Sequence, residues 1–323
     1  MPSAPHRIDT HHHFLPPDYV RIVGREAIGS LIVSGEAPDW RPSHSIDVMD
    51  RHGIATAVLS MSAPGVCVND REATRALCRH CNEYAARMRS DYLGRFGLFA
   101  CLPLPDVEAS LREITFAFDE LGADGIGLLT SYGDRYPGDP EFAPVFDELN
   151  RRGAVVYFHP TVGACNQCLK HIPAATLDFP FDTTRAVTDL LFSGTLARCQ
   201  NIRFIFSHAG GTIPFLAERI ARLEVRPQFK RHVPDGAINE LRRLYFDTAL
   251  SANAYSISGM RQLVSDDRIL FGSDYPFAPE STTTASVKAL ASLGLDAGTL
   301  RKIERDNALS LMPGLEAAAV PSV

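Results

Sequence analysis

Three features are scarce in this sequence of 323 residues: long apolar runs, blocks of basic residues, and cysteine. No apolar run approaches the ~18–20 residues that cross a bilayer, which excludes a transmembrane protein. The 32 Lys and Arg residues are spread out and outnumbered by 38 Asp and Glu residues, giving a net charge of −6. A nucleic-acid binder that follows phosphate groups is therefore not expected.

Cysteine usage and the amino terminus both favour a cytoplasmic location. Seven cysteines are an odd number at low density, which is more typical of a reducing compartment than of a disulfide scaffold. The first five residues lack the basic stretch and apolar core of a secretory signal. We therefore expect a cytoplasmic protein that has no membrane partner.

Histidine is the feature that points toward function. Hydrophobic residues make up 45% and charged residues 22%, the balance of a globular protein, which excludes disorder and coiled coil. Within this composition there are 11 histidines, three of them consecutive, from His11 to His13. Three are too few for a purification tag, and they adjoin a strand-like run. We interpret them as native residues.

Eight short apolar runs alternate with stretches of helical periodicity. The runs have no polar alternation, the pattern of strands buried on both faces of a parallel sheet, and cover 7–10, 56–61, 96–102, 125–129, 154–158, 202–207, 244–247 and 268–271. Between them, 70–89, 106–121, 141–152, 183–198 and 299–311 read as helices. This order predicts an α/β fold, a (β/α)₈ TIM barrel, as one domain over 1–323 with its core at about 7–313. Long loops are expected after strand one (14–45) and strand five (160–182).

Histidine and aspartate side chains occur at the carboxyl ends of several predicted strands. His11 and His13 lie just past strand one, His159 follows strand five, His208 follows strand six and Asp274 follows strand eight. These ends meet at one mouth of a parallel barrel, so residues far apart in sequence can share one metal ion. The strand period puts His11 and His13 on one side, while His12 points away. Imidazoles with one carboxylate suit Zn²⁺ and leave a position for water or substrate.

Simpler roles exist for each of these residues taken singly. A lone His or Asp at a strand end usually caps the strand or is satisfied in the core, but five at the same end favour a shared site. Two C-x-x-C pairs, Cys78/Cys81 and Cys165/Cys168, raise the alternative of a structural zinc site. The pairs are far apart and the first lies within a predicted helix, so we expect free thiols. The chemistry of the second pair is not readable from the sequence.

Four motifs resemble the amidohydrolase-related (amidohydrolase 2) branch of the metal-dependent hydrolases, specifically its non-oxidative decarboxylases. They run in family order from residue 7 to about residue 313 and are Ile8-Asp9-Thr10-His11-His12-His13-Phe14, Phe158-His159-Pro160, Ser207-His208-Ala209-Gly210-Gly211 and Phe271-Gly272-Ser273-Asp274-Tyr275-Pro276-Phe277. The runs 157–161 and 178–185 are most similar to 6-methylsalicylate decarboxylases; aminocarboxymuconate-semialdehyde and γ-resorcylate decarboxylases are further relatives.

The resemblance implies a role for each matching position. His11, His13, His159 and Asp274 would bind one divalent metal ion, with His208 and Asp274 as the catalytic acid–base groups. The fourth predicted strand carries no lysine for a bridging carbamate, which favours a single metal. His11 stands where γ-resorcylate-type members carry Glu, which favours Zn²⁺ over Mn²⁺ without excluding the latter.

The resemblance also suggests where a carboxylate substrate would be held. Arg185 and Arg219 are candidate anchors, and the spacing of Arg219 from His208 implies that it reaches the site of a neighbouring subunit in a homodimer. An equally weighted alternative for each arginine is that it is an ordinary charged side chain on the solvent-facing side of a helix. Phe14 and Trp40 are candidate aromatic walls, although core packing is the commoner use of such residues. Ser45 stands where an aminocarboxymuconate-type enzyme would carry another Arg, so that substrate is in doubt.

The predicted function is a metal-dependent carboxy-lyase that releases CO₂ from a small aromatic (salicylate-, 6-methylsalicylate- or resorcylate-like) or related unsaturated acid. The alternative is a hydrolase of the same superfamily (a lactonase, amidase or C–C hydrolase), because one set of metal ligands serves both reactions. A barrel that binds without turnover is a third reading, which the complete ligand set disfavours. The expected partner is a small carboxylic acid, in a homodimer or higher homo-oligomer.

Overall fold

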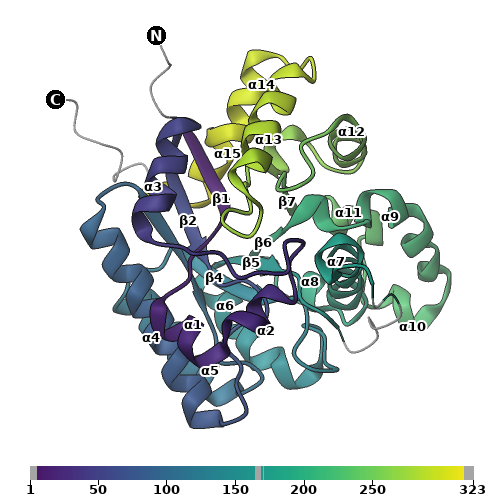
Figure 1. Cartoon of the computed structure of the whole chain (residues 1–323). Coiled ribbons are helices and arrows are strands. Elements are labelled where there is room, and N and C mark those ends of the chain that lie inside the picture. Colours follow the sequence, from purple (N-terminus) through teal and green to yellow (C-terminus); the bar gives the residue numbers. More distant parts are fainter. Residues whose placement is uncertain (1–5, 164–168, 170, 316–323) are drawn as a thin grey trace.

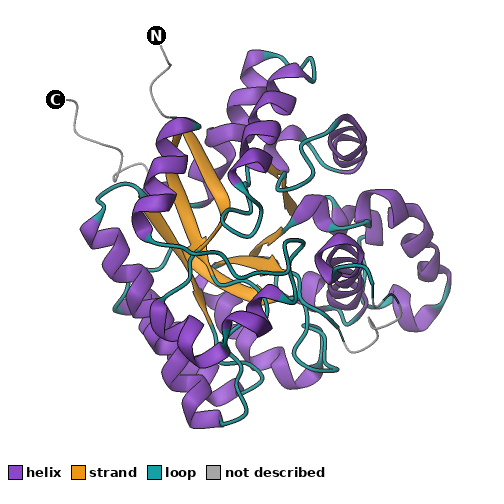
Figure 2. Ribbon diagram, viewed as in Figure 1, coloured by secondary structure: helices purple, strands orange, loops and turns teal. Residues whose placement is uncertain are grey.

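Eight parallel strands in sequence order form one sheet in the described part of the chain. The structure, a computed structural model, describes residues 6–163, 169 and 171–315. Figure 2 shows the strands at the centre of the molecule with helices outside them. The strands are β1 (Arg7–His13), β2 (Ile54–Ser60), β3 (Phe96–Cys101), β4 (Gly125–Leu129), β5 (Val155–His159), β6 (Arg203–Phe206), β7 (Tyr245–Asp247) and β8 (Ile269–Leu270). The predicted α/β barrel is confirmed.

Hydrogen bonds between β1 and the segment after β8 bring the two edges of the sheet together. The backbone N–H of Thr10 donates to the carbonyl of Phe271 at 2.9 Å, and that of His13 donates to the carbonyl of Tyr275 at 2.8 Å. One end of the barrel is therefore a closed ring of strand ends, as parallel strands require if their polar edges are not to remain unpaired.

Helices surround the barrel and follow its strands along the chain (Figure 1). Among the described residues, none of them is long and apolar enough to cross a membrane. They are α1 (Pro17–Val23), α2 (Arg25–Gly29), α3 (Pro42–Arg51), α4 (Arg71–Asp91), α5 (Val107–Asp119), α6 (Ala143–Arg152), α7 (Ala174–Phe192), α8 (Thr195–Arg198), α9 (Ile213–Ala221), α10 (Pro227–Lys230), α11 (Ala237–Leu241), α12 (Ala254–Leu263), α13 (Glu280–Ser292), α14 (Ala297–Arg301) and α15 (Asn307–Leu311).

Two predicted loops contain helices, and one predicted strand is longer than expected. The segment 14–45 holds α1 and α2 and the start of α3, and the segment 160–182 gives way to α7 at Ala174. The start of this helix was not predicted because it contains Pro180, and proline normally ends a helix. In the structure the hydroxyl of Thr184 donates to the Pro180 carbonyl at 2.8 Å. β1 includes His11 and His13, which were expected just beyond the strand.

Apolar side chains fill the barrel and the layer between barrel and helices. Close packing inside needs a very small residue on β4, because a side chain on Gly125 would meet the carbonyl of Val155 and the ring of Phe99. Phe99 in turn stacks on Tyr157, with ring centres 5.3 Å apart. The interior cluster comprises Ile8, Val58, Phe99, Val155, Tyr157, Ile205, Tyr245, Leu270, Ala308, Leu311, Met312 and Leu315.

A buried carboxylate connects the end of β4 to α7. Asp182 is fully buried and accepts hydrogen bonds from the hydroxyls of Thr130 (2.5 Å), Ser131 (3.1 Å) and Tyr136 (2.7 Å). Such charge-assisted bonds are among the stronger ones in proteins. They hold the loop after β4 against the helix that follows β5, next to the mouth of the barrel.

Replacement of this carboxylate should destabilise the protein. Asp182→Ala removes the shared acceptor from three hydroxyl groups, and we expect the free energy of unfolding to fall by about 2–5 kcal/mol. Urea unfolding followed by circular dichroism measures the loss. Asp235→Ala, at an exposed position, is the matched control and should change stability by less than about 0.5 kcal/mol. Equal stabilities of the two variants would contradict the role given to Asp182.

Candidate metal centre and active site

Four side chains converge at the carboxyl end of the barrel. His11 and His13 come from β1, His159 ends β5, and Asp274 follows β8. Their candidate ligand atoms all lie within 4.8 Å of one another, and all four residues are buried. Oδ1 of Asp274 is 3.1 Å from Nε2 of His11 and 3.2 Å from Nε2 of His13. The structure thus brings together the four predicted ligands.

Hydrogen bonds fix the orientation of each imidazole through Nδ1. His11 Nδ1 lies 2.8 Å from Asp247 Oδ2, and Nδ1 of His13 and His159 donate to the carbonyls of Ser60 (3.0 Å) and of the residue after His159 (2.8 Å). This turns each Nε2 toward the common centre. Outer partners of this kind accompany metal-binding histidines.

Unpaired buried atoms show that this donor set fits a divalent cation. Nε2 of His11, Nε2 of His13 and Oδ1 of Asp274 have no hydrogen-bond partner among the described residues, although all are buried. Buried polar atoms without partners are unfavourable unless something else binds them. Three imidazole nitrogens and one carboxylate oxygen are the ligands that Zn²⁺ and other first-row divalent ions take.

The charges around the centre are set by burial and by two carboxylates. Burial lowers the pKa of His13 and holds that of His159 well below its usual value, so both rings are neutral at pH 7. Burial opposes the neighbouring Asp247 and Asp274 carboxylates at His11, but the carboxylates prevail and raise its pKa to about 10. Burial favours the neutral acid at Asp274, yet His11 and the other rings keep its pKa well below the usual range. A cation bound here would take the place of the His11 proton.

His208 lies beside the four ligands as the predicted acid–base group. Its Nε2 is 3.5 Å from Asp274 Oδ2, and neither ring nitrogen has a hydrogen-bond partner among the described residues. The backbone of His208 has φ 53°, a left-handed conformation that is uncommon outside glycine, and its N–H donates to Asp247 Oδ1 at 2.9 Å. The ring is therefore held beside Asp274 by the backbone.

Two aspartates that were not among the predicted site residues organise the site. Asp247, at the end of β7, binds His11 and the backbone of His208. Asp9 accepts from the backbone N–H and hydroxyl of Ser273, the residue before Asp274, at 3.0 and 2.5 Å, and lies 2.9 Å from His12 Nδ1. His12 thus points away from the metal centre, as predicted. The signal for Asp247 was available, because it ends the predicted strand 244–247.

A cavity of about 260 Å³ opens beside the ligands. Its floor includes His159, His208 and Asp274, and its walls come from the segment after β1, from α7 and from the loops after β7 and β8. The described residues that line it are Ile32, Val33, Ser62, His159, Ala175, Phe179, His208, Leu250, Asp274, Phe277, Ala278, Pro279 and Thr282. Among the described residues, the lining therefore combines ionisable groups at one end with mainly apolar walls and contains no Lys or Arg.

The four predicted substrate-binding residues lie outside this lining. Arg185 is partly buried on α7, and Arg219 is exposed on α9. Phe14 is buried and stacks on Tyr84, with ring centres 6.3 Å apart. Trp40 is also buried in the core, and its Nε1 donates to the hydroxyl of a neighbouring serine at 2.9 Å. Their substrate-binding role stays a prediction, while Phe277 does contact the cavity. Cys165 and Cys168 lie outside the described residues.

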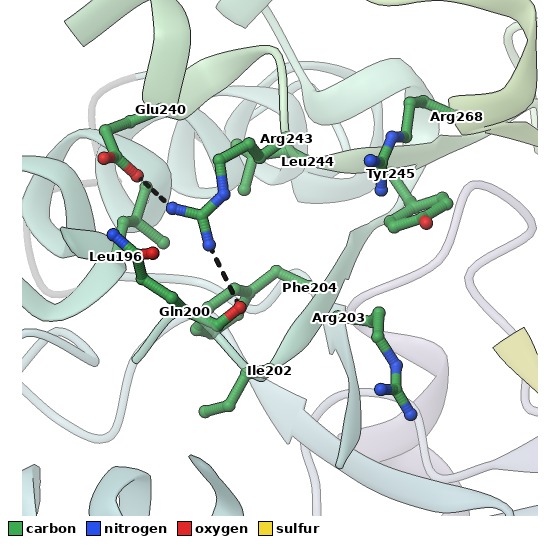
Figure 3. Close-up of a pocket in the computed structure, with 10 residues that line it drawn as sticks. All are labelled: Leu196, Gln200, Ile202, Arg203, Phe204, Glu240, Arg243, Leu244, Tyr245 and Arg268. Carbon is green, nitrogen blue, oxygen red and sulfur yellow. Dashed lines mark hydrogen bonds and ion pairs between the residues drawn. The ribbon is translucent and has the colours of Figure 1, made fainter. Parts of the chain in front are cut away.

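A second cavity, of about 280 Å³, lies at the opposite end of the barrel, where β6, β7 and β8 begin (Figure 3). Arg243 donates to Glu240 and to the carbonyl of Gln200, the two bonds drawn in Figure 3. The guanidinium of Arg268 lies 4.4 Å from the ring centre of Tyr245. The described lining of this second cavity has no histidine and only one carboxylate, that of Glu240, which is already paired. The second cavity therefore offers no metal-binding or acid–base set comparable to that of the first.

Comparisons with known proteins agree with this geometry. The chain is 37% identical to a decarboxylase of Aspergillus niger (yanB) over 97% of its own length and 89% of that protein, and 36% identical to the 6-methylsalicylic acid decarboxylase of Penicillium expansum over 96% and 97%. A crystal structure of an amidohydrolase II matches 95% of this chain and 99% of its own, with TM-score 0.88 and 27% identity.

A 5-carboxyvanillate decarboxylase from Novosphingobium aromaticivorans, solved with manganese and a nitrobenzoic acid, has TM-score 0.83 at 21% identity, covering 95% of this chain and 96% of its own. At 21% identity, this likeness concerns the fold alone. The family model for amidohydrolases (Amidohydro_2) matches residues 8–313, from β1 to the end of the last helices. The resemblance seen in the motifs is thereby confirmed, and the chain belongs to the amidohydrolase family.

Proposed function

We propose that this protein is a metal-dependent, non-oxidative decarboxylase of a small aromatic acid of the salicylate type. The observation that carries the proposal is the convergence of His11, His13, His159 and Asp274, with His208, on the floor of one cavity. The decarboxylase names of the relatives with 36–37% identity support the same reaction class. The hydrolase alternative needs the same ligand set, so product analysis separates the two.

The cavity suits a flat, largely apolar molecule with its polar groups at one end. Phe179 and Phe277 provide aromatic surface, and the Phe277 ring lies 5.3 Å from that of His13. Planar rings pack well against such side chains. An aromatic acid would thus place its carboxylate and a neighbouring hydroxyl toward the ligands and its ring carbons against the walls.

The four ligands and His208 divide the chemistry of decarboxylation. A divalent cation held by the ligands supplies a Lewis acid for the substrate's oxygens. His208 delivers a proton to the ring carbon that bears the carboxylate, because its ring nitrogens are unpaired and it lines the cavity. Asp274 Oδ2 lies 3.5 Å away and faces that ring; because its pKa stays well below the usual range, Asp274 is less suited than His208 to the proton-donor role that the resemblance also gives it. The bond to the carboxylate carbon then breaks, CO₂ leaves, and the bonding electron pair restores the aromatic ring.

Zn²⁺ is the metal that we propose for the site. Three neutral nitrogen ligands and one carboxylate favour a borderline-soft ion over the oxygen-preferring ions. Manganese is the alternative, since it is the ion in the 5-carboxyvanillate decarboxylase of similar fold. We also propose that the protein works in the cytoplasm, in agreement with the free thiols of Cys67, Cys78, Cys81, Cys101 and Cys199.

We further propose a homodimer that forms through α9 and α12. Phe215 on α9 is 90% exposed and Tyr255 on α12 is 93% exposed, and the two helices pack against each other. Exposed aromatic side chains on neighbouring elements are typical of protein interfaces. Arg219 lies one helical turn after Phe215 and is also exposed. Residues four apart share a helix face, which fits the expected reach of Arg219 toward a second subunit.

Metal removal should abolish activity, and product analysis should identify the reaction. We expect the purified protein to contain about one metal ion per chain and to release CO₂ from at least one salicylate- or resorcylate-type acid. Chelation should remove the activity because the Lewis acid is lost, and Zn²⁺ should restore it better than Mn²⁺. Elemental analysis and CO₂ detection measure these effects. Cleavage of an ester or lactone with no CO₂ release from any acid would replace the proposal with the hydrolase alternative.

Removal of the His208 ring should separate catalysis from metal binding. His208→Asn suits the left-handed backbone, because Asn tolerates positive φ, but it cannot donate the proton as an imidazolium. We expect kcat to fall by about 10²–10⁴-fold while the metal content is unchanged. His80→Asn on α4 is the control. A kcat within a few-fold of the native value would show that His208 is not the acid–base group.

Loss of the two exposed aromatic side chains should weaken self-association. In Phe215→Ser/Tyr255→Ser we expect the dissociation constant of the dimer to rise by at least about 100-fold, because interface aromatics are often the strongest contributors. Sedimentation velocity over a concentration series measures the change. Leu93→Ser, which alters another exposed apolar residue, should leave the dimer intact. A native protein that is monomeric at all concentrations would rule out the dimer.

A further inference from the structure

The described walls of the cavity offer a substrate ring few side chains that can form hydrogen bonds. Beyond the histidines and Asp274 on the floor, the polar side chains in the described lining are those of Ser62 and Thr282. Ser62 lies at the floor, with its hydroxyl 3.4 Å from His159 Nε2. The remaining lining residues are apolar. Apart from the Thr282 hydroxyl, a ring substituent that points away from the floor therefore meets mainly carbon atoms of the described lining.

Leu250 is the most unusual of these apolar residues. It has φ 53°, in the left-handed region where branched side chains are disfavoured, and the residue is 49% exposed. An apolar side chain that is half exposed on a strained backbone gains little for stability. Unfavourable backbone conformations that persist are concentrated at ligand-binding sites. Both features indicate that Leu250 is placed for contact with a ligand.

The loop that carries Leu250 is fixed to the metal centre. The N–H of Ala249 donates to Asp247 Oδ1 at 3.0 Å, and the N–H of Ser251 donates to the Thr248 carbonyl at 2.9 Å. The same Asp247 carboxylate holds His11 through its other oxygen. Leu250 is therefore held in a defined position relative to the ligands by hydrogen bonds on both sides.

We propose that Leu250 is a specificity-determining residue, which selects substrates with a nonpolar ring substituent over those with a hydroxyl at the same position. The inference rests on the proposed function, because it assigns the substrate class of that site. A methyl group and a hydroxyl group are close in size, so a pocket separates them by polarity. A hydroxyl placed against Leu250 loses its hydrogen bonds to water and gains none, whereas a methyl group gains from burial.

Two acids that differ at one ring position test this selection. 6-Methylsalicylate and 2,6-dihydroxybenzoate share the carboxylate and one ortho hydroxyl and differ by methyl against hydroxyl. We expect the native protein to favour 6-methylsalicylate by roughly 10- to 100-fold in kcat/KM, the range that apolar pockets reach against a polar isostere. A native protein that prefers 2,6-dihydroxybenzoate would overturn the inference.

Leu250→Asn is the decisive variant, because Asn has the same number and branching of side-chain heavy atoms, tolerates positive φ and supplies an amide to the hydroxyl. We expect the preference for the methyl substrate to fall at least about tenfold, with circular dichroism and metal content unchanged. Leu250→Gly should lower kcat/KM for the methyl substrate without a gain for the hydroxyl substrate. Leu93→Asn, at an exposed loop position outside the cavity lining, should retain the native ratio. An unchanged ratio in Leu250→Asn would exclude the role.

Binding of the two reaction products separates this inference from the proposed function. Calorimetry with 3-methylphenol and 1,3-dihydroxybenzene needs no turnover, so it remains informative if neither acid releases CO₂. If no salicylate- or resorcylate-type acid releases CO₂, the decarboxylase proposal fails. The assignment of Leu250 then stands if the native protein binds 3-methylphenol more tightly and Leu250→Asn removes the difference. It fails if the two phenols bind equally to the native protein.

Discussion

The site depends on one buried carboxylate, that of Asp247. Its Oδ2 orients His11, and its Oδ1 accepts hydrogen bonds from the backbones of His208 and Ala249. The predicted metal ligand on β1, the predicted acid–base residue after β6 and the loop after β7 are therefore all fixed by one group at the end of β7. Since the carboxylate is fully buried, these bonds are not weakened by exchange with water. Functional groups that are far apart in the sequence are thereby held in fixed positions relative to one another.

The buried negative charge of Asp274 indicates that a bound cation would stabilise the site. Asp274 is buried among three imidazoles, and its pKa stays well below the usual range although burial acts in the opposite direction. Buried carboxylates are costly unless a positive charge or several donors face them. Each of the three histidine ligands forms a hydrogen bond through its outward-facing Nδ1, so its inward-facing Nε2 remains for an ion. Folding and metal binding are therefore expected to be coupled.

The sequence predicted the parts of the site that follow from strand order. Each ligand ends or follows an apolar run, and parallel strands bring such ends together, so His11, His13, His159 and Asp274 could be grouped without a structure. Asp247 satisfied the same rule and was still missed, because a single aspartate at a strand end usually has a local role. The positions of Phe14 and Trp40 could not be predicted, since the residues between β1 and β2 pack through tertiary contacts. Their aromatic character fits a core as well as a cavity.

Backbone strain is the property that local sequence could not reveal. In the described part of the chain, the residues other than glycine with positive φ are His208, Ala209, Leu250 and Asp274, which follow β6, β7 and β8. Propensity disfavours this conformation for each of them, at a cost of about 1–3 kcal/mol per residue. The barrel tolerates it because interior packing and the Asp247 hydrogen bonds determine the backbone there. Three of the four residues line the cavity, so the strain lies where side chains must be aimed at a ligand rather than at the core.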